Sequence, residues 1–119
     1  TDLTKEVLYY FSERIAKARS FGINDLIVDP GFGFSKTLEQ NYQLFNDLEL
    51  FSNLNIPLLL GISRKSMIQK KIKKTAADSL NGTTALHAIA IQKGVSILRV
   101  HDVKEAFETI NLLQNLKFH

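Results

Sequence analysis

The sequence contains no cysteine, so its 119 residues can form neither a disulfide framework nor a thiolate metal site. Its three histidines, His87, His101 and His119, are scattered and lack the spacing of metal ligands. No apolar run approaches the roughly 20 residues that a membrane-spanning helix needs, and no secretory signal opens the chain. A formal net charge of +3 does not call for a polyanionic partner. We therefore expect a cytoplasmic protein that binds neither membrane nor nucleic acid.

The composition, 45% hydrophobic and 23% charged, is typical of a globular domain, here taken as residues 1–119. Because the chain opens with Thr1 rather than Met, we expect a processed or excised piece. Periodicity predicts one helix followed by three strand–helix units, an order that calls for parallel strands joined by right-handed crossovers. The predicted strands are 24–29, 56–62 and 95–101; the predicted helices are 3–19, 38–53, a short one starting near Ser66, one from Thr83 or Thr84 to Gln92, and one after Asp102.

Local signals mark several helix ends. Thr37 and Gln40 form a capping-box pattern, and Asp102 with Glu105 suggests a second cap. Gly22 is placed to end the first helix. The last helix is predicted to bury one apolar face, made of Val103, Phe107, Ile110 and Leu113.

The segment from Asp29 to Lys36 places an acid at a predicted strand end, followed by Pro30, Gly31 and Gly33. Proline stops the strand, and the glycines allow backbone conformations that a side chain would block. Two interpretations fit this pattern. Asp29 either belongs to a ligand site of the kind α/β proteins build at strand ends, or it only caps the turn.

Polar residues also follow the other two predicted strands. They are Ser63, Arg64 and Lys65 after the second strand, and Arg99 and His101 at the end of the third. The amino ends of the strands have no such cluster, and parallel α/β proteins collect ligands at the carboxyl ends. The cations, with the backbone donors of a helix starting near Ser63, form a candidate anion site. A carboxylate can accept two donors from a heterocycle edge, so the site suits a planar nitrogen heterocycle attached to a phosphate or diphosphate.

Each of these residues also has a purely structural interpretation. Arg99 could pair with Asp29 or Asp102, and His101 could be a satisfied histidine at a strand end. Arg64 fits a solvated or salt-bridging role better than a ligand role. The basic run 70–74 fits a solvated helix face, and His87, among alanines and a leucine, fits packing.

Three motifs together resemble dihydropteroate synthase over practically the whole chain. They are Asp29-Pro-Gly-Phe-Gly-Phe-Ser-Lys36 with Asn41, Gly61-Ile-Ser-Arg-Lys-Ser66, and Arg99-Val-His-Asp-Val103. The resemblance implies the carboxyl-terminal part of a (β/α)8 barrel, with the motifs on its sixth, seventh and eighth strands. It also implies an enzyme of folate biosynthesis, which joins 6-hydroxymethyl-7,8-dihydropterin diphosphate to 4-aminobenzoate and releases diphosphate.

The same resemblance implies roles for individual residues. Asp29, Gly61, Lys65 and Arg99 would bind the pterin, and Arg99 with His101 would bind the departing diphosphate. Lys65, Arg99 and His101 are the implied catalytic residues. Phe34 would pack against the aminobenzoate ring and Ser66 would receive its carboxylate, at the position where sulfonamides compete.

A complete (β/α)8 barrel needs about 250 residues, so the resemblance also implies that the amino-terminal half is missing. The implied cofactor, Mg2+, would have its ligand in that half, and no metal ligand is expected in this chain. The isolated chain is expected to lack synthase activity. Its unpaired sheet edges favour association or marginal stability, and the resemblance implies a homodimer through the last helices.

Two other functions remain open. A methyltetrahydrofolate-type pterin-binding domain would share the strand-end acid, but it has no use for a Lys, Arg and His diphosphate site. A non-catalytic association module would keep the surface without binding the ligand.

Overall fold

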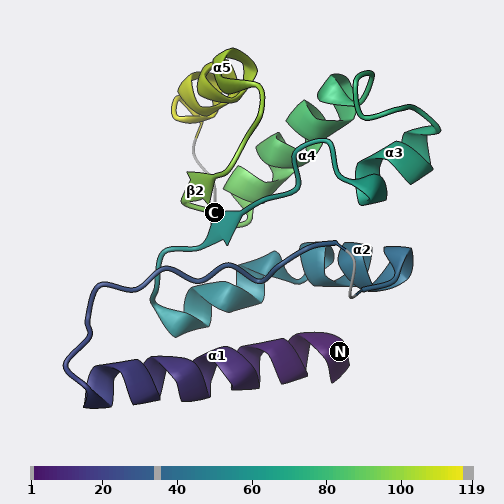
Figure 1. Ribbon diagram of the computed structural model, residues 1–119. Helices are drawn as coiled ribbons and strands as arrows, with labels where there is room; N and C mark the ends of the chain where they lie inside the picture. The colour runs from purple at the N-terminus through teal and green to yellow at the C-terminus, as the bar shows by residue number, and fades with distance from the viewer. Residues whose placement is uncertain (1, 34–35, 117–119) are drawn as a thin grey trace.

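The computed structural model describes the chain over residues 2–33 and 36–116. Helices dominate it, and a short parallel sheet runs through the middle (Figure 1). The elements in chain order are α1 (Asp2–Ser20), α2 (Leu38–Asn46), the 3-10 helix η1 (Leu48–Leu54), β1 (Leu59–Leu60), α3 (Ser66–Ile72), α4 (Leu80–Gln92), β2 (Ile97–Leu98) and α5 (Val103–Leu113).

The sheet is parallel, as predicted, but its strands are much shorter than predicted. Leu59 and Leu60 pair with Ile97 and Leu98, and Val28 forms an isolated parallel bridge to Leu58. The predicted strands 24–29, 56–62 and 95–101 therefore shrink to one bridge residue and two residue pairs. A physical reason is that Val28 and β2 are each paired on one side only within the described residues, so the ladder has no second neighbour to extend it.

Three predictions about helix ends were wrong. The predicted helix 38–53 breaks at Asp47 and continues as η1 to Leu54. The helix expected from Thr83 or Thr84 begins one turn earlier, at Leu80, after the N-cap residue Ser79. Asp102 precedes α5 but makes no side-chain cap, because its carboxylate binds Arg64 instead.

Other local predictions were confirmed. Thr37 and Gln40 form the reciprocal capping box at the start of α2. Gly22, which follows α1, takes a positive φ of 82°. The short helix near Ser66 is α3, and the basic run that ends it is exposed, as a solvated helix face requires.

The core lies between the sheet and α2, η1, α3 and α4. Its fully buried side chains include Leu44, Leu48, Phe51, Leu60, Ile62, Met67 and Ile68. Within the second predicted strand, Leu58 and the consecutive residues 60–62 are buried. Helix α1 covers this core from below in Figure 1, with Ile15 buried and Phe11 edge-on to Phe51.

Apolar side chains remain exposed beside the bridge residue Val28 and on α5. Ile27, beside the bridge residue Val28, is 58% exposed. On α5 the predicted apolar face was partly wrong: Val103 and Phe107 are exposed, whereas Ala106 and Thr109 are buried.

The radius of gyration, 14.9 Å, exceeds the roughly 13.5 Å expected for a compact domain of this length. The described part of the chain is therefore less compact than a typical domain of this length, in keeping with the apolar side chains that it leaves exposed.

Candidate functional site

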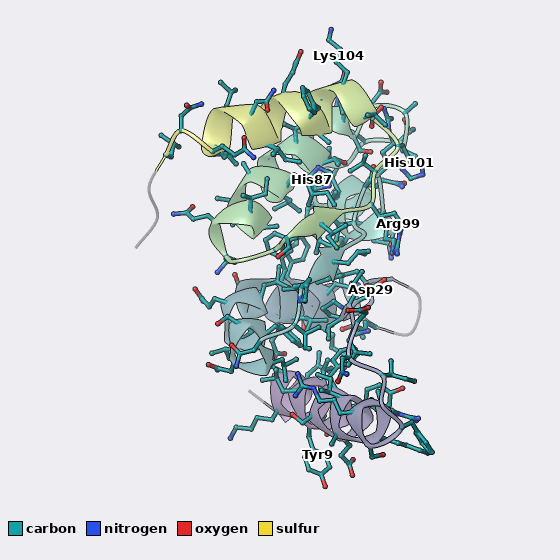
Figure 2. All side chains as sticks on the ribbon, turned by 90° about the vertical axis from the view of Figure 1, so that its left-hand side faces the viewer. Tyr9, Asp29, His87, Arg99, His101 and Lys104 are labelled. Atoms are coloured by element: carbon teal, nitrogen blue, oxygen red, sulfur yellow. The ribbon has the colours of Figure 1, made fainter. Side chains whose placement is uncertain are left out.

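The carboxyl ends of β1 and β2 enclose one small cleft. Its volume is about 130 Å3, and it is lined by Gly61, Ser63, Lys65, Arg99, Val100 and His101. Figure 2 shows Asp29, Arg99 and His101 following one another along one edge of the molecule. The structure thus brings together residues from all three predicted strand ends. A ligand pocket for a drug-sized molecule usually measures about 300–1,000 Å3, so this cleft accounts for only part of such a site.

Asp29 uses both carboxylate oxygens. Oδ1 accepts a hydrogen bond from the backbone N–H of Gly31 (3.0 Å), and Oδ2 accepts one from Nη1 of Arg99 (2.9 Å). Both structural interpretations of the sequence are therefore confirmed: Asp29 caps its loop, and Arg99 pairs with Asp29. Both side chains nevertheless remain open to solvent, so a ligand can reach them.

Gly61 provides the room for Arg99. A Cβ atom at residue 61 would overlap the Arg99 guanidinium and lie 2.6 Å from its Cζ. The guanidinium therefore rests directly on the backbone at the end of β1. Because any larger residue would push it away, Gly61 contributes by its lack of a side chain.

Lys65 joins the end of β1 to the glycine-rich loop. Its Nζ donates a hydrogen bond to the carbonyl of Phe32 at 2.7 Å. Burial lowers the pKa of the Lys65 ammonium, the positive charge of Arg99 lowers it further, and Asp29 partly opposes the shift. An ammonium that is partly desolvated and beside another cation gains from an incoming anion or electron-rich ring atom.

The glycine-rich loop is held at two other points. Gly31 and Gly33 have φ values of 73° and 134°, which favour glycine. The backbone N–H of Gly33 donates to Oδ1 of the buried Asn41 (3.2 Å), and the ring of Phe32 packs edge-on to Phe45. Phe34, predicted to contact aminobenzoate, lies outside the described residues. Ser66, the other residue predicted for that substrate, is the exposed first residue of α3.

Arg64 does not contribute to the predicted anion site. Its Nε and Nη2 donate to the two oxygens of Asp102, both at 2.8 Å, and its Nη1 donates to the carbonyls of Ala76 and Ala77. The guanidinium is thus occupied by protein groups. The interpretation of Arg64 as a salt-bridging residue is confirmed, and its inclusion among the anion-binding cations was wrong.

His87 is buried in α4, as the packing interpretation predicted (Figure 2). Burial lowers its pKa, and its Nε2 has no hydrogen-bond partner among the described residues. A groove of about 590 Å3 lies elsewhere, over α2 and Lys71. No group of three or more His, Asp or Glu side chains in residues 2–33 and 36–116 could hold a metal ion.

Two residues that organise the site were named from the sequence without that role. Asn41 fixes the glycine-rich loop, and Ser63 contacts His101 through its hydroxyl. Asn41 stood within a recognised motif but carried no assigned role, since its partner is a backbone group. Ser63 stood among the strand-end residues, and only the position of the neighbouring strand shows what it touches.

Comparison with known proteins decides the family. The model of the family described as pterin binding enzyme matches residues 1–101. This chain belongs to the pterin-binding enzymes. The dihydropteroate synthase of Escherichia coli is 44% identical over 115 residues, which cover 95% of this chain and 41% of that protein. The Helicobacter pylori bifunctional dihydropteroate synthase/dihydropteroate reductase is 37% identical and covers 98% of this chain and 30% of its own length.

Solved structures of this family have the same fold. The dihydropteroate synthase of Yersinia pestis with a pterine–sulfa conjugate has a TM-score of 0.92 at 37% identity, covering 97% of this chain and 46% of that chain. That of Thermus thermophilus has a TM-score of 0.91 at 36% identity, covering 98% and 47%. The predicted fold class is confirmed: the chain is part of a (β/α)8 barrel. It spans less than half the length of these relatives.

No described helix of this pterin-binding enzyme chain is both long and apolar enough to cross a membrane.

Proposed function

We propose that residues 1–119 supply one side of the active site of a dihydropteroate synthase. The observation that carries this proposal is the cleft in which Lys65, Arg99 and His101 converge beside the open carboxylate of Asp29. This combination suits a ligand with a hydrogen-bonding heterocycle at one end and a diphosphate at the other. The relatives named dihydropteroate synthase and the family model support the same assignment.

The pterin would bind on the Asp29 side of the cleft. Nη1 of Arg99 donates a hydrogen bond to one oxygen of Asp29. The amino group and ring N–H of an aminopyrimidine edge can replace that contact, because a carboxylate accepts two parallel donors. Lys65, already positioned by the carbonyl of Phe32, would donate to the pterin's oxygen and ring-nitrogen side.

The diphosphate would bind on the Arg99 and His101 side. Once the pterin takes Asp29, the guanidinium of Arg99 is free to pair with diphosphate oxygens while it rests on Gly61. The reaction breaks the bond between the pterin methylene carbon and the diphosphate oxygen. The amino nitrogen of 4-aminobenzoate then forms a new bond to that carbon and loses a proton, and diphosphate leaves. Arg99 and His101 would stabilise the charge that grows on the leaving oxygen.

Other parts of the proposal rest on the resemblance alone. Phe34 and Ser66 would contact 4-aminobenzoate, at the position where sulfonamides compete. Mg2+ would help neutralise the diphosphate, but the described residues offer no ligand cluster for it, so no step is assigned to the metal. We further propose that the protein acts in the cytoplasm.

The proposal assigns binding, but not turnover, to the isolated chain. The cleft is small, about 130 Å3, and the chain spans 41% of its Escherichia coli relative. We propose that the complete enzyme is a homodimer through the last helices, which is supported by the exposed Val103 and Phe107 on α5. Light scattering of a Phe107→Glu variant is expected to show a weaker dimer than the parent. A stable monomeric parent would contradict the dimer.

Calorimetry with inorganic diphosphate and with a pterin diphosphate analogue tests the function. We expect the chain to bind both, and Arg99→Lys to weaken both, because a lysine lacks the planar fork. Lys104→Arg, on the exposed side of α5, serves as a control that also exchanges the two cation types. Binding of a pterin without any gain from its diphosphate would favour a methyltetrahydrofolate-type domain. No binding at millimolar concentration would favour an association module.

A further inference from the structure

Ser63 lies behind His101 and contacts it twice. The serine directly follows the core residue Ile62 and is only 5% exposed. Its Oγ lies 2.9 Å from Nδ1 of the His101 ring and 3.3 Å from the backbone nitrogen of the same residue. One hydroxyl at the end of β1 therefore holds both the backbone and the ring of a residue that follows β2.

Hydrogen-bond accounting assigns the proton on the His101 ring. A serine hydroxyl has one hydrogen to donate and two lone pairs to accept with. The backbone N–H of His101 donates to Oγ, so the hydroxyl hydrogen remains for Nδ1. Within the described residues Ser63 Oγ has no other partner. If Nδ1 carried the proton, Oγ would accept twice and its own buried hydrogen would be left unpaired, which is unfavourable.

This arrangement makes Nε2 the donor in both charge states. In the neutral ring the proton resides on Nε2, because Nδ1 accepts from Ser63. In the charged ring both nitrogens carry protons, and Nδ1–H can donate to the second lone pair of Oγ. His101 thus offers an N–H to an anion whether or not the ring is charged.

The residues that follow Ser63 and His101 hold these two side chains close together. Arg64 follows Ser63 and Asp102 follows His101, and these two form the two-point ion pair at 2.8 Å. Arg64 also binds the carbonyls of Ala76 and Ala77, ahead of α4. Because the pair fixes the spacing of the two strand ends, the Ser63 hydroxyl stays within reach of the His101 ring.

We propose that Ser63 is a positioning residue for His101. The Ser63 hydroxyl donates its hydrogen to Nδ1, which therefore acts as the acceptor. The ring proton stays on Nε2, and Nε2–H remains available to an oxygen of the departing diphosphate. The assignment of the anion rests on the function proposed above, whereas the assignment of the ring proton rests on the contacts of Ser63 alone.

The position of the ring proton can be measured directly by nitrogen-15 NMR of the histidine side chains, in the chain without added ligand and at alkaline pH. His101→Gln identifies the signals of His101 among those of the three histidines. We expect the wild-type ring to carry its proton on Nε2 and to show a hydrogen-bonded Nδ1. In Ser63→Ala we expect Nδ1 to shift towards the value of an unbonded nitrogen. A proton on Nδ1 in the wild type, or identical Nδ1 shifts in both proteins, would overturn the proposal.

A binding measurement tests the consequence. Ser63→Ala is expected to bind inorganic diphosphate about tenfold more weakly, since one well-oriented hydrogen bond to a charged group is at stake. Thr109→Ala is the matched control, because it removes a similarly buried hydroxyl that bonds only to the Glu105 carbonyl of its own helix. It should bind within twofold of the wild type. Equal losses in both variants would reject positioning. A wild type that binds no diphosphate would defeat the proposed function, and the ring spectrum would still decide the role of Ser63.

Discussion

Two arginine–aspartate pairs lie at the same end of the sheet and differ in geometry and exposure. Arg64 and Asp102 meet at two points, both 2.8 Å, with side chains 22% and 21% exposed. Arg99 and Asp29 meet at one point, 2.9 Å, with side chains 57% and 37% exposed. Nη1 of Arg64 also binds two carbonyls of the chain, whereas Arg99 rests on Gly61 at the edge of an open cleft.

The difference shows that residue type alone does not assign a role. Both arginines come shortly after a strand and both pair with an acid, yet the Arg64 pair joins distant segments, whereas we propose that the Arg99 pair opens to bind a ligand. Solvent-exposed ion pairs contribute only about 0–1 kcal/mol, so opening the Arg99 pair is inexpensive. The Arg64–Asp102 pair therefore stabilises the fold, and we propose that the Arg99–Asp29 pair belongs to the ligand-binding site.

The largest expected effect is that of Arg99→Ala on anion binding. The affinity for inorganic diphosphate should fall about 100-fold, because the variant loses a charge-assisted pair. The midpoint of thermal unfolding, Tm, should fall by no more than about 5 °C, as expected for an exposed pair. Calorimetry and a thermal melt measure the two quantities. A variant that keeps full affinity would break the distinction between the pairs.

Arg64→Ala should have the opposite pattern. We expect the largest loss of Tm among the variants considered, because the segment before α4 and Asp102 at the start of α5 lose their common partner, the Arg64 guanidinium. Diphosphate affinity, measured well below Tm, should fall less than tenfold, since no donor to the ligand is removed. A melt indistinguishable from that of the wild type would show that the pair is not structural.

Two glycine substitutions sharpen the same distinction. Gly61→Ala would push the Arg99 guanidinium away, and should weaken diphosphate binding about tenfold. Gly82→Ala would place its Cβ 2.8 Å from Cγ2 of Ile68 in the core, and should lower Tm while leaving affinity unchanged. Both glycines have ordinary φ values, so backbone strain does not confuse the comparison. The reversed pattern in either variant would contradict the roles assigned to the two places.

The smallest expected effect concerns acid stability. The hydrogen bonds from Arg64 lower the pKa of Asp102 below its ordinary value of 3.8. The folded state therefore binds this proton less readily than the unfolded state. The resulting stabilisation is fully present above about pH 3.8 and is lost as the pH falls through the lower folded pKa. Asp102→Asn should have a flatter dependence of Tm on pH below about 3.8, and the exposed Asp25→Asn should follow the wild type.

The sequence was sufficient to predict which residues gather at the site. Asp29, Lys65, Arg99 and His101 follow apolar segments, and parallel strands necessarily place their carboxyl ends at one edge. The capping box of Thr37 and Gln40 was equally predictable, because both partners lie within one turn.

The sequence was not sufficient to predict hydrogen-bond partners that lie far apart along the chain. Asp102 has a local pattern for capping α5, but Arg64, 38 residues away, outcompetes the local backbone donors. The hydroxyl of Ser63 has many possible partners until His101 is placed beside it. The lengths of the strands could not be predicted from the sequence either, because a strand extends only where a neighbouring strand pairs with it.

The most direct test of the account measures diphosphate affinity and Tm side by side for Arg99→Ala and Arg64→Ala. The account predicts that Arg99→Ala loses affinity about 100-fold with a nearly unchanged Tm, and that Arg64→Ala loses Tm with a smaller loss of affinity. Parallel losses in the two variants, or the reverse assignment, would contradict the division of the two pairs into binding and architecture.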